Sequence, residues 1–126
     1  MKYFRYAEFD SPDEPGSGFN MSREFLKMLD ECRELARIPF VVTSGFRTKA
    51  HQEYLTAKGY ATSKTSAHMM GMAADILCEN SADRYRILTA ALAVGFNRVG
   101  IARNFIHLDN ANHTNEKTTE VVWLYD

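Results

Sequence analysis

The decisive stretch of the chain reads Ser66-Ala67-His68-Met69-Met70-Gly71-Met72-Ala73-Ala74-Asp75. Its second half opens an apolar run that predicts a strand over residues 72–78. Side chains alternate between the two faces of a strand, so Asp75 shares a face with the small side chain of Ala73. Gly71 permits a tight turn through which His68 can fold back toward Asp75. The stretch therefore predicts a buried strand with an imidazole and a carboxylate at one polar site.

A second histidine follows in Phe105-Ile106-His107-Leu108-Asp109. In a strand, His107 and Asp109 share one face, while Ile106 and Leu108 point to the core. Buried charged groups need strong partners, because burying an unpaired charge is costly. Each group alone is more often an ordinary core histidine or a capping carboxylate, but a bound cation would satisfy all of them. Two histidines and one aspartate are enough to hold zinc and leave one position open, as a catalytic zinc requires.

The order of elements predicts an α+β fold. Apolar side chains at helical spacing predict helices over residues 22–37, 49–57 and 81–94. The third helix is expected to start at Ser81 and to turn Tyr85, Leu88 and Leu92 inward. Short strands are predicted over residues 40–43, 72–78, 97–101, 104–108 and 120–125, and a loop over residues 60–67. We expect a single domain, residues 1–126, with a small, mainly antiparallel sheet flanked by about three helices.

Composition narrows the class of protein. Apolar residues make up 45% of 126 residues, which is enough to fill a core without help from a metal. A net charge of −1 without any basic block argues against a nucleic-acid-binding protein. No apolar run approaches the roughly 20 residues that span a membrane, and the first residues do not resemble a secretory signal. We therefore expect a monomer made in the cytoplasm without a signal peptide.

The pattern Ser66-x-His68-x-x-Gly71-x-Ala73-x-Asp75 resembles the motif of the zinc D-Ala-D-Ala carboxypeptidase and L-alanyl-D-glutamate peptidase family, which shares its fold with the hedgehog signalling domain. The likeness covers roughly residues 20–125 and includes three further blocks: Ser44-Gly45-Phe46-Arg47, Gly100-Ile101 with Phe105 to Asp109, and Trp123. It implies a hedgehog/DD-peptidase-like fold and a zinc ion (Zn2+) held by His68, Asp75 and His107. It also implies that Arg47 contacts the substrate and that Ser66 lines the substrate pocket.

One part of the motif departs from the family. Many relatives carry a proton-accepting Glu or Asp three residues before the last zinc histidine, and others carry a histidine two residues before it. Here these positions hold Asn104 and Phe105. Asp109 is the remaining candidate for the catalytic proton acceptor. The alternative is that Asp109 orients a metal ligand from behind.

The resemblance implies a zinc metallopeptidase that hydrolyses an amide bond in the stem peptide or cross-link of bacterial peptidoglycan. Its action would be that of a D,D-carboxypeptidase, or of an L-Ala-D-Glu or D,D-endopeptidase. We expect a phage lysis enzyme of the endolysin kind, made in the host cytoplasm and acting on the cell wall after release. Asn104 favours one alternative, a non-catalytic zinc-binding hedgehog-like binding module. A second alternative, a non-haem iron oxygenase built on His107-x-Asp109, leaves Asp75 without a role.

Overall fold

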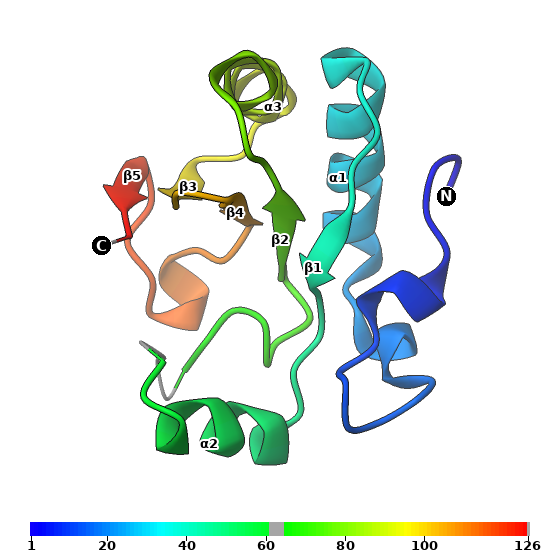
Figure 1. Ribbon diagram of the computed structural model, residues 1–126, viewed down its shortest axis with the longest axis vertical. Helices are drawn as coiled ribbons and strands as arrows, with labels where there is room; N and C mark the ends of the chain where they lie inside the picture. Colours follow the sequence, from blue (N-terminus) through cyan, green and yellow to red (C-terminus); the bar gives the residue numbers. More distant parts are fainter. Residues whose placement is uncertain (61–64, 126) are drawn as a thin grey trace.

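The computed structural model describes residues 1–60 and 65–125, which form three α-helices and a five-stranded sheet (Figure 1). The helices are α1 (Arg23–Ala36), α2 (Lys49–Ala57) and α3 (Ser81–Val94). The strands are β1 (Val42–Ser44), β2 (Ala73–Leu77), β3 (Arg98–Ile101), β4 (Phe105–Asp109) and β5 (Val121–Leu124). Three short 3-10 helices complete the fold, over Tyr6–Phe9, Ser17–Asn20 and His113–Asn115. The predicted loop 60–67 lies partly outside the described residues.

The sheet has the strand order β1-β2-β4-β3-β5. All neighbouring strands are antiparallel except β3 and β5, which are parallel. Helices α1 and α3 pack against one another, and α2 lies at the opposite end of the molecule from α3 in Figure 1. This arrangement confirms the predicted α+β class with a mainly antiparallel sheet. Within the described part of the chain, no helix is long and apolar enough to cross a membrane.

Helix α1 begins and ends where its sequence predicts. The Ser22 hydroxyl accepts a hydrogen bond from the backbone N–H of Phe25 at 3.2 Å, which satisfies one free donor of the first turn. The helix ends as Arg37 enters the left-handed region with φ 60°. Its buried residues recur at helical spacing on one face and include Phe25, Leu29 and Cys32. This face closes the core over the sheet.

Helix α3 differs from the prediction in its start and in its inner face. Its N-cap is Asn80 rather than Ser81, and the Asn80 side chain accepts a hydrogen bond from the Asp83 N–H at 2.8 Å. The inward orientation predicted for Tyr85 and Leu92 is wrong, because these side chains are 70% and 51% exposed. Leu88 is partly buried against the core, and the fully covered positions are Ile87, Ala90 and Ala91. Alanines on this face allow the backbones of α3 and α1 to approach closely.

The register of the strands divides the sheet into an apolar face and a polar face. The core side carries Ala74, Ile76, Val99, Ile106 and Leu108, all of which are fully buried. On the other side, Asp75 pairs with His107 across β2 and β4, and Arg98 pairs with Asp109 across β3 and β4. Directly opposite residues of paired strands share a face. Four polar side chains from three adjacent strands are thereby gathered on one surface of a rigid sheet.

Candidate metal centre

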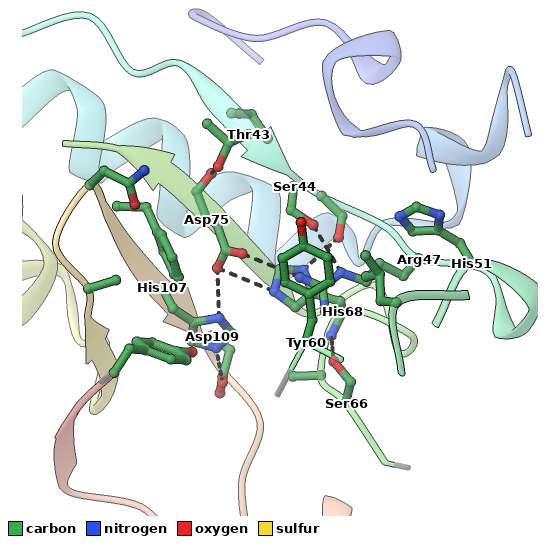
Figure 2. Close-up of a pocket in the computed structure, with 18 of the residues that line it drawn as sticks. Thr43, Ser44, Arg47, His51, Tyr60, Ser66, His68, Asp75, His107 and Asp109 are labelled. Carbon is green, nitrogen blue, oxygen red and sulfur yellow. Dashed lines mark hydrogen bonds and ion pairs between the residues drawn. The ribbon is translucent and has the colours of Figure 1, made fainter. Parts of the chain in front are cut away.

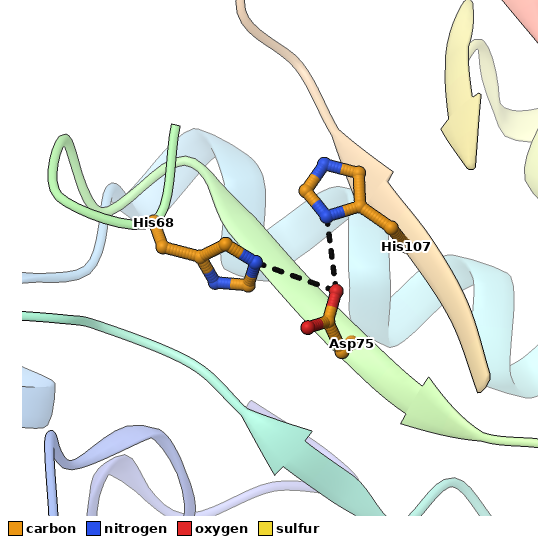
Figure 3. Close-up of side chains that lie close together, drawn as sticks. All are labelled: His68, Asp75 and His107. Carbon is orange, nitrogen blue, oxygen red and sulfur yellow. Dashed lines mark hydrogen bonds and ion pairs between the residues drawn. The ribbon is translucent and has the colours of Figure 1, made fainter. Parts of the chain in front are cut away.

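Three side chains that are far apart in the sequence meet at the polar face of the sheet (Figure 3). Oδ1 of Asp75 lies 3.3 Å from Nε2 of His68 and 2.9 Å from Nδ1 of His107. One possible ligand atom from each residue lies within 4.8 Å of the others, and all three residues are buried. The structure thus brings together the three residues that the sequence proposes as metal ligands.

His68 is held in place by the loop that precedes β2. A left-handed Gly71, with φ 71°, turns the chain, and its carbonyl accepts a hydrogen bond from the N–H of Ser22 at 2.8 Å. Nδ1 of His68 lies 2.8 Å from the carbonyl oxygen of Gly45. Because a carbonyl only accepts hydrogen bonds, Nδ1 carries the hydrogen, and the lone pair of Nε2 is left facing Asp75.

His107 is held from behind in the same way. Its Nε2 lies 2.7 Å from Oδ2 of Asp109, while its Nδ1 faces Asp75. An ionised carboxylate only accepts hydrogen bonds, so Nε2 donates to Asp109 and Nδ1 is the nitrogen available to a cation. The carboxylate–histidine pair behind a metal is a recurrent arrangement that fixes the tautomer and the orientation of the ring.

The charges of the three side chains are strongly coupled. Without a metal, the histidine nitrogens that face Asp75 can instead carry a proton. Burial alone would raise the pKa of Asp75, but hydrogen bonds from the protonated rings of His107 and His68 outweigh it and hold that pKa well below the usual value. Burial lowers the pKa of His68, and the Asp75 carboxylate only partly opposes this. Burial would also lower the pKa of His107, but its hydrogen bonds to Asp109 and Asp75 raise it. Asp75 is therefore an ionised carboxylate, as a metal ligand must be.

Arg47 enters the site from the turn after β1 (Figure 2). Its guanidinium lies 3.4 Å from Oδ2 of Asp75 and donates to the Ser44 hydroxyl at 3.0 Å and to the Gln52 side-chain oxygen at 3.3 Å. The Ser66 hydroxyl accepts a hydrogen bond from the His68 N–H at 3.2 Å. Arg47 and Ser66 both line the cleft above the three ligands, and their contacts with substrate stay predictions.

Asp109 lies on the polar face but behind His107 rather than beside the open side of the centre. It is 1% exposed. Oδ2 accepts from His107, and Oδ1 accepts from the Arg98 guanidinium at 2.7 Å and from the Ala111 N–H at 3.1 Å. The predicted role of proton acceptor stays a prediction. Since both oxygens are engaged, the geometry favours the alternative role of orienting His107.

Three residues of the site were missed from the sequence: Arg98, Gln52 and Tyr125. Strand alternation could have predicted the face on which Arg98 lies, because Arg98 and Gly100 are two residues apart in β3 and so share a face. Its pairing with Asp109 depends on the register of the hairpin, which the sequence does not fix.

Gln52 is 4% exposed on α2, and no local pattern distinguishes it from the solvated residues of that helix. Tyr125 follows β5 and reaches the same cleft, where burial raises the pKa of its phenol and its ring lies 6.3 Å from that of Trp123.

The centre lies in a cleft of about 1380 Å³. His51 and Tyr60 line it from the side of α2, whereas Phe105, Trp123 and Tyr125 line it from the side of β4 and β5. The indole of Trp123 lies 5.4 Å from the His107 ring, between ring centres. The cleft has room for a peptide-sized molecule, and His68, Asp75 and His107 are among the residues that line it.

The donor set fits zinc. Two neutral imidazole nitrogens and one carboxylate oxygen converge, each rear histidine nitrogen has an acceptor, and the remaining side opens to the cleft. Structural zinc sites are closed by four protein ligands, whereas catalytic sites keep a position for water or substrate. The arrangement is therefore that of a catalytic rather than a structural site.

Comparison with known proteins agrees with this geometry. The model of the family described as Peptidase M15 matches residues 2–109. Among solved structures, the fold is similar to the crystal structure of the Serratia marcescens L-Ala D-Glu endopeptidase ChiX, with a TM-score of 0.58 and 17% sequence identity. The match covers 76% of this chain and 84% of that chain. No curated protein matches the chain.

Proposed function

The chain belongs to the peptidase M15 family, and we propose that it is a zinc-dependent peptidase that hydrolyses an amide bond in the peptide part of bacterial peptidoglycan. Family membership confirms the resemblance inferred from the motif and supports a peptidase over the non-catalytic binding module. One observation carries the proposal. A single carboxylate oxygen, Oδ1 of Asp75, lies close to both Nε2 of His68 and Nδ1 of His107, and all three residues line an open cleft.

In this proposal, zinc is held by His68 Nε2, Asp75 and His107 Nδ1. Zinc in such a site lowers the pKa of a bound water toward about 7 and polarises a carbonyl group. An iron site built on His107 and Asp109 is disfavoured, because Asp109 lies behind the ring and bonds to its other nitrogen. Asp75, which that alternative leaves without a role, lies instead at the centre of the cluster.

Arg47 is proposed to bind the substrate. Its contacts with Ser44, Gln52 and Asp75 use three of the five N–H donors of a guanidinium and hold its plane at the cleft wall. A fixed guanidinium pairs well with a carboxylate or with the oxyanion that develops on a carbonyl under attack. Ser66 would line the same pocket, while its hydroxyl supports the turn that carries His68.

The first candidate bond is L-Ala–D-Glu in the stem peptide. The support for it is the likeness of fold to a protein described as an L-Ala D-Glu endopeptidase. Hydrolysis of D-Ala-D-Ala or of a D,D cross-link is the second candidate. The role of phage lysis enzyme, released to act on the wall, is part of the same proposal.

Mass spectrometry of peptides released from a peptidoglycan of known composition tests the bond directly. We expect zinc-loaded protein to split the stem peptide into one fragment with a new L-Ala carboxyl terminus and one with a new D-Glu amino terminus, whose masses together exceed that of the intact molecule by one water. The Asp75→Ala variant, which lacks the carboxylate shared by both histidines, should release none of them. If the wild-type protein carries zinc and cleaves no stem or cross-link bond, the proposed substrate is wrong.

A further inference from the structure

Arg98 is connected to the candidate metal centre through two short contacts in series. Its Nε lies 2.7 Å from Oδ1 of Asp109, and Oδ2 of the same carboxylate lies 2.7 Å from Nε2 of His107. The other nitrogen of that ring faces Asp75 at 2.9 Å. The order of groups from the rear of the site to its front is therefore guanidinium, carboxylate, imidazole and metal position.

The Arg98 side chain is itself fixed on several sides. It extends from β3, where it pairs with Asp109 across the antiparallel register. Its guanidinium lies 5.1 Å above the ring of Trp123 and donates a hydrogen bond to the carbonyl of Thr118. Its side chain is only 11% exposed. A planar guanidinium held in this way presents its donor to Asp109 in one direction.

We propose that Arg98 is a positioning residue, which fixes the Asp109 carboxylate and thereby aims Nδ1 of His107 at the metal. This inference rests on the proposed function, because it assigns a role at the same metal site. Asp109 is almost completely buried, and a buried carboxylate without a cationic partner would be strongly destabilised. With Arg98 in place, Asp109 is an ionised acceptor on the rear of His107, so the ring must donate from Nε2 and offer Nδ1 to the cation.

The chemistry of Asp109 separates this role from that of a proton acceptor. A proton acceptor for an attacking water needs a carboxylate oxygen on the open side of the metal. The Asp109 oxygens instead meet Arg98, the Ala111 N–H and His107. Substitution of Arg98 should therefore weaken metal binding, and any loss of turnover should follow from the lower metal content.

The test is a double-mutant cycle read as zinc affinity, measured by competition with a chromophoric chelator. Arg98→Met is compared in the wild-type protein and in Asp109→Asn. We expect Arg98→Met alone to weaken zinc binding by about tenfold and Asp109→Asn by about ten- to a hundredfold, the range found for groups behind metal ligands. In the Asp109→Asn protein, Arg98→Met should have less than about a twofold further effect, because the two residues act as one unit.

Arg33→Met is the matched control. Arg33 also stacks on an aromatic ring, 4.4 Å from that of Tyr3, and is partly buried, but it contacts no residue of the metal site. It should leave zinc affinity unchanged. The proposal is overturned if Arg98→Met leaves zinc affinity intact, or if it weakens zinc binding equally in the two backgrounds. Should Arg98→Met fail to fold, Arg98→Lys replaces it in the cycle with the same criteria, since it keeps the charge but loses the planar fork.

The absorption spectrum of the cobalt-substituted protein adds a readout that a loss of general stability would not change. A rotated His107 ring should alter the visible bands of bound cobalt in Arg98→Met and not in Arg33→Met. Failure of the proposed function gives a different result: without a zinc site the wild-type protein itself would bind no zinc, and without peptidase activity it would bind zinc but cleave no peptidoglycan. A wild type that binds zinc and an Arg98→Met variant with the same affinity and spectrum would refute only the positioning role.

Discussion

Gly100 lies opposite Trp123 on the parallel strands β3 and β5, and the indole occupies the space where a side chain at residue 100 would be. A Cβ placed on Gly100 would lie 2.6 Å from the indole nitrogen. On its other side, Gly100 pairs with His107 in β4. The missing side chain thus lets the indole cross β3 and approach the His107 ring, 5.4 Å away between ring centres.

We therefore expect Gly100→Ala to displace Trp123 and to loosen the candidate metal centre. Overpacking of this kind costs about 1–3 kcal/mol of the free energy of unfolding. Trp123 is the only tryptophan of the chain, so its fluorescence reports the displacement directly. The control is Val122→Ala, which shortens a neighbouring, 56% exposed side chain of β5. Unchanged fluorescence and unchanged zinc affinity in Gly100→Ala would contradict the packing argument.

Asp109→Asn separates the two roles considered for this residue. If Asp109 positions His107, the variant binds zinc about ten- to a hundredfold more weakly but recovers most turnover when zinc is saturating. If Asp109 accepts the proton of the attacking water, turnover stays low at any zinc concentration, by about a hundredfold or more. Peptidoglycan hydrolysis measured along a zinc titration distinguishes these outcomes. Persistent inactivity of the fully zinc-loaded variant would restore the proton-acceptor role.

The metal-free protein should lose stability in acid because of its buried carboxylates. Burial would raise the pKa of Asp109, but the hydrogen bonds that it accepts from His107 and Arg98 lower that pKa below the ordinary value of 3.8. The pKa of Asp75 is also lowered below this value. A lowered folded-state pKa contributes stability above the unfolded value, and this contribution is lost as the pH falls through the folded value. Urea unfolding at a series of pH values from neutral to below 3.8 should therefore show falling stability at the acid end.

The Asp109→Asn variant provides the control for that experiment. Its free energy of unfolding should fall less steeply below the ordinary carboxyl pKa, because Asp75 is then the one remaining carboxylate of the buried pair whose pKa is lowered. Acid curves of equal steepness in the variant and the wild type would mean that Asp109 does not contribute to the effect.

Zinc should stabilise the folded protein, because the ligands converge only in that state. The gain is about 2.7 kcal/mol when free zinc is a hundred times the dissociation constant. Thermal unfolding with added zinc and with a chelator measures the difference. Ser66→Ala, which keeps all three ligands, should retain most of the gain, while His68→Ala should lose nearly all of it. Equal melting temperatures with zinc and chelator in the wild type would count against the site.

Much of the fold was predictable because it depends on local pattern. Strand alternation placed Asp75 and His107 on the polar face of the sheet, and Ser22 marked the start of α1. The inner face of α3 was not predictable in the same way. Tyr85 and Leu92 are as apolar as residues that face a core, but the close approach of α1 selects the small side chains of Ala90 and Ala91 instead.

The sequence predicted the three metal ligands but not the groups that hold them in place. The predicted strands over residues 97–101 and 104–108 left the register of the hairpin open, and the structure pairs Arg98 with Asp109 and Ile101 with Ile106. A small shift of a hairpin turn changes which residues lie opposite one another, so the contact of Arg98 with Asp109 could not be predicted from the sequence. The Gly45 carbonyl that holds His68 comes from a distant loop, and no local signal predicts such a backbone contact.

The zinc content of purified protein after dialysis tests the central claim most directly. Three proteins are compared: the wild type, Asp75→Ala, and Asp83→Ala as a control carboxylate at the start of α3. We predict about one zinc ion per chain in the wild type and in Asp83→Ala, and almost none in Asp75→Ala, because one carboxylate oxygen serves both histidines. Zinc retained equally by all three proteins, or by none of them, would contradict a metal centre formed by His68, Asp75 and His107.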